Sequence, residues 1–286
     1  MLSNKVSEIM TAGVITSPAS STIFDVMKLM AARKVGAVVI TDGQTPAGIF
    51  TEYDVVRRVM NKKWDPRKTG IKRAMTSPVR AVPQDTHIIE ALGKMYHGRF
   101  RHLLIRGEKG AMVGMVSMRD ILKLAVKLGQ GLTETQTIGS LMSKNIVTVD
   151  ASQSIHHTVE TMVEENTGCI VVLSGGKPKG IFTERDIVKR VAISDVDTKK
   201  TPIQEVMTAP IVIMSHSALV GEVLAEMHRR DFRNMPIRGN KEELAGLVSM
   251  GDVLKYARAL DIDDSVHKAW KEVEEFWESE EHYTPG

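Results

Sequence analysis

Hydrophobic residues recur with helical spacing in one segment of the chain and then run together in the next. In TIFDVMKLMAARK, Ile23, Met27 and Met30 fall at i, i+4 and i+7, which is the spacing of one helix face. The β-branched run GAVVIT follows, then an Asp-Gly turn, and then the strand pattern GIFT, which leads into a second helical stretch, DVVRRVM. A short extended segment, GVITSP, precedes the first helix. The predicted order is therefore β-α-β-β-α.

This order occurs four times along the chain. The strands GIFTEYD, GMVSMRD, GIFTERD and GLVSMGD begin 66 residues apart, and each is preceded by a second marker, Met followed by Thr or Ser. The four repeats, here units 1 to 4, span about residues 5–62, 71–127, 138–194 and 203–258. Units 1 and 3 share FTE-x-D, and units 2 and 4 share VSM-x-D. A unit of ~60 residues is only marginally stable alone, so we expect a duplicated pair of units.

Met-Thr followed by this order of elements and by G-h-h-[ST]-x-x-D resembles the CBS domain, named after cystathionine β-synthase. Two CBS units form a Bateman module. The resemblance therefore implies an α+β fold of four β-α-β-β-α repeats, packed as two pseudo-twofold pairs in tandem. The modules are expected at residues 1–130 and 131–260, with a boundary in the Gly- and Thr-rich stretch 128–137, followed by a tail at 261–286.

Each unit carries a Ser or Thr three residues before an Asp, where its second helix begins. The pairs are Thr51 and Asp54, Ser117 and Asp120, Thr183 and Asp186, and Ser249 and Asp252. The plain explanation is a capping box that satisfies free N–H groups of the helix. A helix N-terminus also suits a phosphate, and a carboxylate can accept hydrogen bonds from both ribose hydroxyls. The resemblance implies this second role, in binding an adenosine compound, and the leading glycine would let the backbone approach that ligand.

Two further sets of residues bear on the ligand. Small residues open the middle strands of units 1 and 3, where a purine could enter or the strands could simply pack closely: Gly36, Ala37, Gly168 and Cys169. Basic residues could grip a phosphate or form surface salt bridges: Arg101, His102, Arg119, Arg185 and Arg233. Tyr53 and Gly251 stand at the positions of two of these arginines, which predicts unequal sites. We expect the strongest sites at Asp120 and Asp186.

Composition and motifs exclude several classes of protein. The chain is 42% hydrophobic and 26% charged, as in globular proteins, and no apolar run reaches the ~20 residues of a membrane span. A single cysteine, Cys169, is typical of a reducing compartment, so we expect a cytoplasmic protein. The absence of a P-loop, a dinucleotide fingerprint and metal-ligand spacings predicts no catalytic residue, no metal and no catalytic cofactor. The scattered basic residues do not favour nucleic-acid binding.

Charge is divided unevenly along the chain. Residues 261–286 hold nine acidic residues against two lysines, a net charge of −7, which leaves +10 for residues 1–260. Apolar residues recur with helical spacing in this acidic tail: Val266, Trp270, Val273 and Trp277. We expect a helix that docks on the body of the protein or across a dimer. The alternatives are a latch over a basic pocket and a docking site for a regulated partner.

Together with these patterns, the resemblance to CBS domains implies a homodimeric regulatory protein that binds AMP, ADP or ATP and transmits the change to a partner protein. The resemblance implies that the modules assemble into a disc with the ligand phosphates pointing inward, which agrees with the basic body. Two alternatives stay open, a sensor of S-adenosylmethionine and a nucleic-acid-binding regulator.

Overall fold

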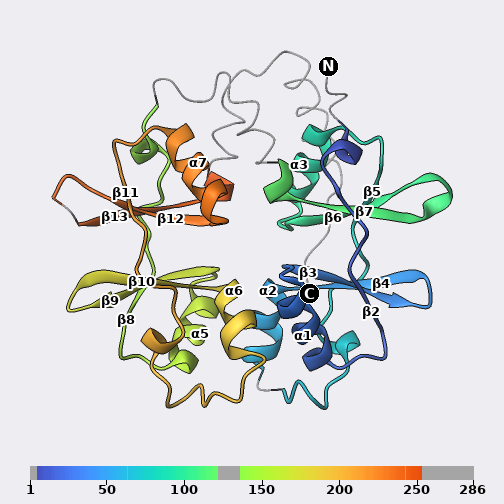
Figure 1. The fold of residues 1–286 in the computed structure, drawn as a ribbon, viewed down its shortest axis with the longest axis horizontal. Coiled ribbons are helices and arrows are strands. Elements are labelled where there is room, and N and C mark those ends of the chain that lie inside the picture. The colour runs from blue at the N-terminus through green and yellow to red at the C-terminus, as the bar shows by residue number, and fades with distance from the viewer. Residues whose placement is uncertain (1–4, 63, 122–135, 242, 253–286) are drawn as a thin grey trace.

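Four small sheets, one for each unit, surround a common centre (Figure 1). The computed structural model describes residues 5–62, 64–121, 136–241 and 243–252. Units 1 and 2 form one half of the molecule, coloured blue to green, and units 3 and 4 form the other half, coloured yellow to orange. The apolar stripe expected in the tail, and most of the boundary expected at 128–137, lie outside the described residues.

Unit 1 shows how the sequence builds each repeat. Its strands, in sheet order, are β2 (Thr16–Pro18), β3 (Ala37–Asp42) and β4 (Thr45–Thr51). The first pair is parallel and the second antiparallel. Helix α1 (Ile23–Arg33) connects β2 to β3 and starts at a capping box formed by Thr22 and Asp25. Its apolar face buries Met27 and Met30, as the helical spacing predicts. The last strand leads into α2 (Glu52–Asp54), which continues as a π-helix over Val55–Met60.

The other units repeat this order. Unit 2 contains β5 (Ala81–Pro83), α3 (Ile88–His97), β6 (His102–Arg106) and β7 (Met112–Ser117). Unit 3 contains β8 (Thr148–Asp150), α5 (Ile155–Glu164), β9 (Cys169–Ser174), β10 (Lys177–Thr183), α6 (Glu184–Asp186) and a π-helix (Ile187–Val191). Unit 4 contains β11 (Met214–Ser215), α7 (Val220–Arg230), β12 (Asn234–Arg238) and β13 (Leu244–Ser249).

Short elements complete the chain between these units. The strand β1 (Thr11–Ala12) joins the sheet of unit 2. Short 3₁₀ turns lie at Val6–Glu8, Ile71–Arg73, Glu108–Gly110, Ile138–Ser140 and Ile203–Glu205. Across the part of the chain that the structure describes, no helix combines the length and apolar character needed to cross a membrane.

The two repeated sequence markers contact each other between the units of a pair. Thr76, which follows the Met of unit 2, pairs with Ile49 in strand β4 of unit 1. Met75 packs against Gly48, where an added Cβ would lie 2.4 Å from the Met75 sulphur. The same contact joins Gly114 to Met10, Gly180 to Met207 and Gly246 to Met142. The leading glycines therefore make room for a methionine of the partner unit, and the ligand contact expected from the sequence stays a prediction.

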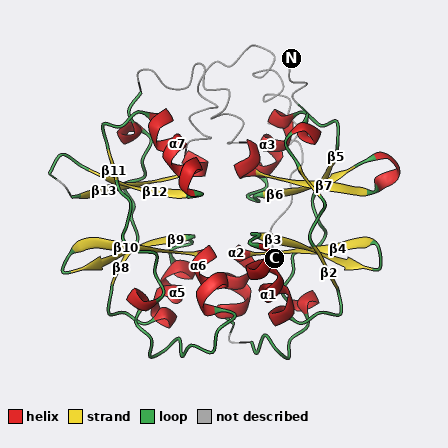
Figure 2. Cartoon of the chain, viewed as in Figure 1, coloured by secondary structure: helices red, strands yellow, loops and turns green. Residues whose placement is uncertain are grey.

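Two apolar cores cross from one half of the molecule to the other. One core joins units 1 and 3 and includes Val55 and Val56 together with Ile187 and Val188. A second core joins units 2 and 4. Figure 2 shows the helical segments of units 1 and 3 meeting between the two halves. Paired strands thus link units 1 and 2, and units 3 and 4, while packed helices link the two pairs.

Candidate functional site

The Ser/Thr-x-x-Asp motif forms a capping box in all four units. In unit 1 the Thr51 hydroxyl donates to Asp54 Oδ2 over 2.6 Å and accepts from the Asp54 backbone N–H over 3.4 Å. The hydroxyl–carboxylate distances are 2.6 Å for Ser117–Asp120, 2.7 Å for Thr183–Asp186 and 2.7 Å for Ser249–Asp252. The capping explanation of the motif is therefore confirmed in every copy. One carboxylate oxygen of each aspartate is used by its own helix.

The second carboxylate oxygens of Asp54 and Asp186 make further contacts with the partner unit and with their own helix. Asp54 Oδ1 accepts from the Thr76 hydroxyl over 3.2 Å, and Asp186 Oδ1 accepts from the Thr208 hydroxyl over 2.9 Å. An arginine one turn further along the helix lies 3.5 Å from each of these oxygens: Arg58 beside Asp54 and Arg190 beside Asp186. Asp54 is 2% exposed and Asp186 6% exposed. Burial raises the pKa of the Asp54 carboxyl despite these contacts.

The aspartates of units 2 and 4 lie in a more accessible setting. Asp120 and Asp252 are half-buried, in contrast to the buried pair in units 1 and 3. Four positions after these aspartates the sequence has Leu124 and Tyr256, where units 1 and 3 have an arginine. The Asp186 carboxylate is therefore less accessible to a ligand than those of Asp120 and Asp252, and the expected order of sites stays a prediction.

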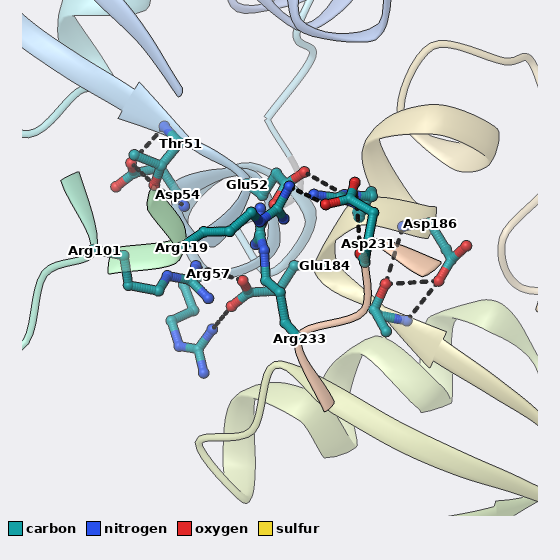
Figure 3. A network of polar contacts seen from close by, with 12 residues as sticks. Thr51, Glu52, Asp54, Arg57, Arg101, Arg119, Glu184, Asp186, Asp231 and Arg233 are labelled. Carbon is teal, nitrogen blue, oxygen red and sulfur yellow. Dashed lines mark hydrogen bonds and ion pairs between the residues drawn. The ribbon is translucent and has the colours of Figure 1, made fainter. Parts of the chain in front are cut away.

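Arginines from all four units meet two buried glutamates at the centre of the molecule (Figure 3). Arg101 of unit 2 lies 2.6 Å from Glu184 of unit 3, and Arg233 of unit 4 lies 2.6 Å from Glu52 of unit 1. Further contacts join Arg57 to Glu184 at 3.3 Å and Arg185 to Glu52 at 3.5 Å. Asp231 pairs with Arg185 at 2.6 Å and also with Arg119. The predicted basic residues thus come together, and each of the four arginines is ion-paired.

The acids of this network are the residues that the sequence interpretation missed. Glu52 and Glu184 directly follow the capping threonines and are 4% and 3% exposed. The repeated FTE of units 1 and 3 was a signal for them, because an acid repeated 132 residues apart occupies the same place in two helices. Asp231 follows helix α7 in a left-handed conformation, with φ of 58°, and its sequence position gave no signal of a central role.

His102 sits among the positive charges of this network. Burial, together with Arg101, Arg233 and Arg119, lowers the pKa of His102 to about 3. The imidazole is therefore neutral at ordinary pH and adds no charge to the network. Burial also lowers the pKa of Arg233 to about 10, and the neighbouring arginines act in the same direction. Both pKa values are lowered mainly by burial, and the nearby arginines add to the effect.

The small residues expected to line a purine pocket lie next to the buried acids. A Cβ at Gly36 would come within 2.9 Å of Arg233 Nη2 and 3.3 Å of Glu52 Oε2, and one at Gly168 would lie 3.1 Å from Glu184. Ala37 and Cys169 begin the strands beside them and are buried. Burial raises the pKa of the Cys169 thiol, so this cysteine is an unreactive core residue. In the described ranges no group of three His, Cys, Asp or Glu side chains is placed to hold a metal ion.

The paired units, the exchanged Met-Thr segments and the shared centre define a protein built from two two-repeat modules. The chain belongs to the CBS domain family, whose model matches residues 6–61, 71–127, 138–193 and 203–259. The fold expected from the sequence is thereby confirmed.

Relatives from plants and archaea are similar to this chain in sequence. CBS domain-containing protein CBSCBSPB1 of Arabidopsis thaliana is 25% identical over 274 residues, which cover 82% of this chain and 50% of the relative. Uncharacterized protein MJ1404 of Methanocaldococcus jannaschii is 23% identical over 269 residues, covering 90% of this chain and 62% of the relative. The chain spans about half the length of the Arabidopsis relatives that it matches.

A solved structure shows the same arrangement of four repeats. Protein MJ1225 of Methanocaldococcus jannaschii, described as a proposed archaeal homolog of g-AMPK, has a TM-score of 0.77 and 16% identity. The likeness covers 88% of this chain and 99% of that one. At this identity the likeness establishes the fold.

Proposed function

We propose that this protein is a regulator that binds adenine nucleotides, namely AMP, ADP or ATP, and passes the resulting change to a protein partner. The observation that carries the proposal is the meeting of hydroxyl–aspartate helix starts with an electropositive group of arginines. The helix starts suit a ribose, and the arginines suit phosphates, which they can grip with two N–H groups at once. The division into modules at 1–130 and 131–260 belongs to the same proposal.

Within this proposal Asp120 and Asp252 hold the ribose more strongly than Asp54 and Asp186. The carboxylates of Asp54 and Asp186 are buried and their second oxygens accept hydrogen bonds from the Thr76 and Thr208 hydroxyls, whereas Asp120 and Asp252 are half-buried and more accessible to a ligand. Asp120 lies next to Arg119, one of the central arginines. This reverses the order expected from the sequence for Asp186 relative to Asp252.

Calorimetric titration with AMP, ADP, ATP, GTP and S-adenosylmethionine tests the function. We expect adenine nucleotides to bind, and Asp252→Ala or Asp120→Ala to weaken their binding by ~10–100-fold, the value of charge-assisted hydrogen bonds. Asp25→Ala is the matched control, because Asp25 forms the same capping box with Thr22 at 2.6 Å in an exposed helix start. Asp25→Ala should remove one helix cap and leave the affinity for nucleotides unchanged.

The same titration separates the other candidate functions. If only S-adenosylmethionine gave a binding signal, the protein would be a sensor of that compound and the nucleotide proposal would be wrong. A panel without any binding would contradict both and leave an interaction scaffold. Equal losses in Asp186→Ala and Asp252→Ala would contradict the assignment of the ribose to units 2 and 4.

A further inference from the structure

Two buried glutamates bind the central arginines across the two halves of the molecule. Glu52 belongs to unit 1 and contacts Arg233 of unit 4, while Glu184 belongs to unit 3 and contacts Arg101 of unit 2, both at 2.6 Å. The two glutamates are 132 positions apart, as are the two arginines, so one arrangement is built twice. Each acid is nearly inaccessible to water. These pairs bind one half of the molecule to the other.

The room for these carboxylates is provided by glycine. Gly36 and Gly168 lie against Glu52 and Glu184, and any side chain there would press on the acid. The backbone N–H of each glutamate also donates to the carbonyl of the adjacent glycine, over 3.1 Å in both units. The strand start and the helix start are therefore shaped around an anionic group in units 1 and 3.

The carboxylates at this centre do not provide a hydrogen-bond partner for every arginine N–H group. In the described part of the chain the network contains five arginines, Arg57, Arg101, Arg119, Arg185 and Arg233, and three acids, Glu52, Glu184 and Asp231. Arg119 Nη2 is buried and has no hydrogen-bond partner. Glu52 Oε2 is also buried without a hydrogen bond, although Arg233 Nη1 lies 2.6 Å away as an ion pair. The ion pairs of this network therefore include more arginines than acids, and one arginine N–H group of Arg119 has no partner among the described residues.

A phosphate group fits this excess better than a carboxylate. It carries up to two negative charges and presents three oxygens, so it can accept from two arginines at once. A glutamate that holds the same arginines must leave them before a phosphate can bind. The glutamates are thus placed to compete with the ligand, and their departure breaks the contact between the two halves.

We propose that Glu52 and Glu184 are built-in competitors of the ligand phosphates, which occupy the phosphate-binding arginines until a ligand displaces them. This inference rests on the proposed function for its ligand, and it assigns the regulatory step of that site. Binding exchanges ion pairs between Glu52 and Arg233, and between Glu184 and Arg101, for contacts with phosphate. The halves of the molecule are then joined through the ligand, and ligands with more phosphates compete better.

Titration of the full chain with inorganic tripolyphosphate tests the exchange without depending on adenosine recognition. Glu184→Gln and Glu52→Gln should each bind tripolyphosphate about tenfold or more tightly than the unmodified chain, the effect of removing a close charge partner. Asp195→Asn is the control, because it removes the same charge from an exposed pair with Arg67 and should change nothing. In a parallel series with adenosine, AMP and ATP, the gain in affinity of each glutamine variant over the unmodified chain should grow with the number of phosphates.

The outcomes are distinct. Unchanged or weaker tripolyphosphate binding in both glutamine variants overturns the exchange, whatever the nucleotides do. Tighter tripolyphosphate binding without any nucleotide binding supports the exchange and contradicts the proposed function. A variant that fails to fold alone should be recovered by tripolyphosphate during refolding, since the anion takes the place of the carboxylate. Failure of both variants to fold in excess tripolyphosphate also overturns the inference.

Discussion

The contact between Met75 and Gly48 gives a quantitative test of how the units are joined. In Gly48→Ala, the new Cβ would lie 2.4 Å from Met75 Sδ, 2.8 Å from its Cγ and 3.0 Å from the Thr76 carbonyl oxygen. Favourable carbon contacts lie at ~3.5–4.0 Å, so the Met75 side chain must withdraw or the strand pairing of Thr76 with Ile49 must widen. Overpacking of this kind costs about 1–3 kcal/mol.

Urea unfolding followed by circular dichroism measures this cost. Gly48→Ala should lower the free energy of unfolding by about 1–3 kcal/mol, and in a Met75→Ala background the same substitution should cost little, because the obstructing side chain is gone. Gly70→Ala is the control, since Gly70 has an ordinary φ of −68° and no atom within 4 Å of its new Cβ. Additive costs in the double variant would refute the exchanged contact between Met75 and Gly48.

Three further predictions follow from the buried polar groups and the shared cores. His102→Asn, which copies Asn234 of unit 4, should reduce the loss of stability on acidification, measured as the melting temperature between pH 7.5 and pH 4. The pKa of His102 is about 3 in the folded chain and 6.5 ordinarily, so the unfolded chain takes up the proton first. The free energy of unfolding then falls by up to ~1.4 kcal/mol per pH unit below about pH 6.5. An equally steep decline in His102→Asn would contradict this role of His102. Thr208→Val should cost about 1–3 kcal/mol in urea unfolding, because it deprives the buried Asp186 of a hydrogen bond, and a loss within the ~0.5 kcal/mol of an ordinary surface substitution would count against it. Residues 1–135 and 136–286 produced separately should expose the core shared by units 1 and 3 and bind a hydrophobic dye or self-associate, whereas two well-packed monomers would show that the halves are independent.

The sequence predicts the repeat and its elements because both depend on local patterns. The i, i+4, i+7 spacing of Ile23, Met27 and Met30 places one face of α1 in the core, and the β-branched run after it forms the middle strand. The capping boxes follow from residues three positions apart, so they too are visible in the chain. Because the units repeat every 66 residues, each prediction made for one unit applies to all four.

Contacts between units depend on three-dimensional neighbours, and the periodicity does not supply them. The Met-Thr marker and the leading glycine were recognisable as repeats, but only the structure shows that Met75 fills the space beside Gly48. In the same way, Arg101 and Arg233 were recognisable as basic residues near the motif. Their partners Glu184 and Glu52 lie 83 and 181 positions away in the chain, and nothing local pairs them.

The two glutamate–arginine pairs of the central network are equivalent by symmetry, but the residues around them are not. The pairs Glu52–Arg233 and Glu184–Arg101 repeat after 132 positions, so they fix the two halves to each other in an equivalent way. Their neighbours differ: Arg185 occupies the place of Tyr53, Arg119 that of Gly251, and Asp231 that of Arg99. Asp231, Arg185 and Arg119 therefore form an additional ionic bridge beside Glu52, while Arg57 supports Glu184 alone. Because the charges around the two glutamates differ, we expect the proposed exchange to differ in free energy at Glu52 and Glu184, so that the ligand would bind in two steps.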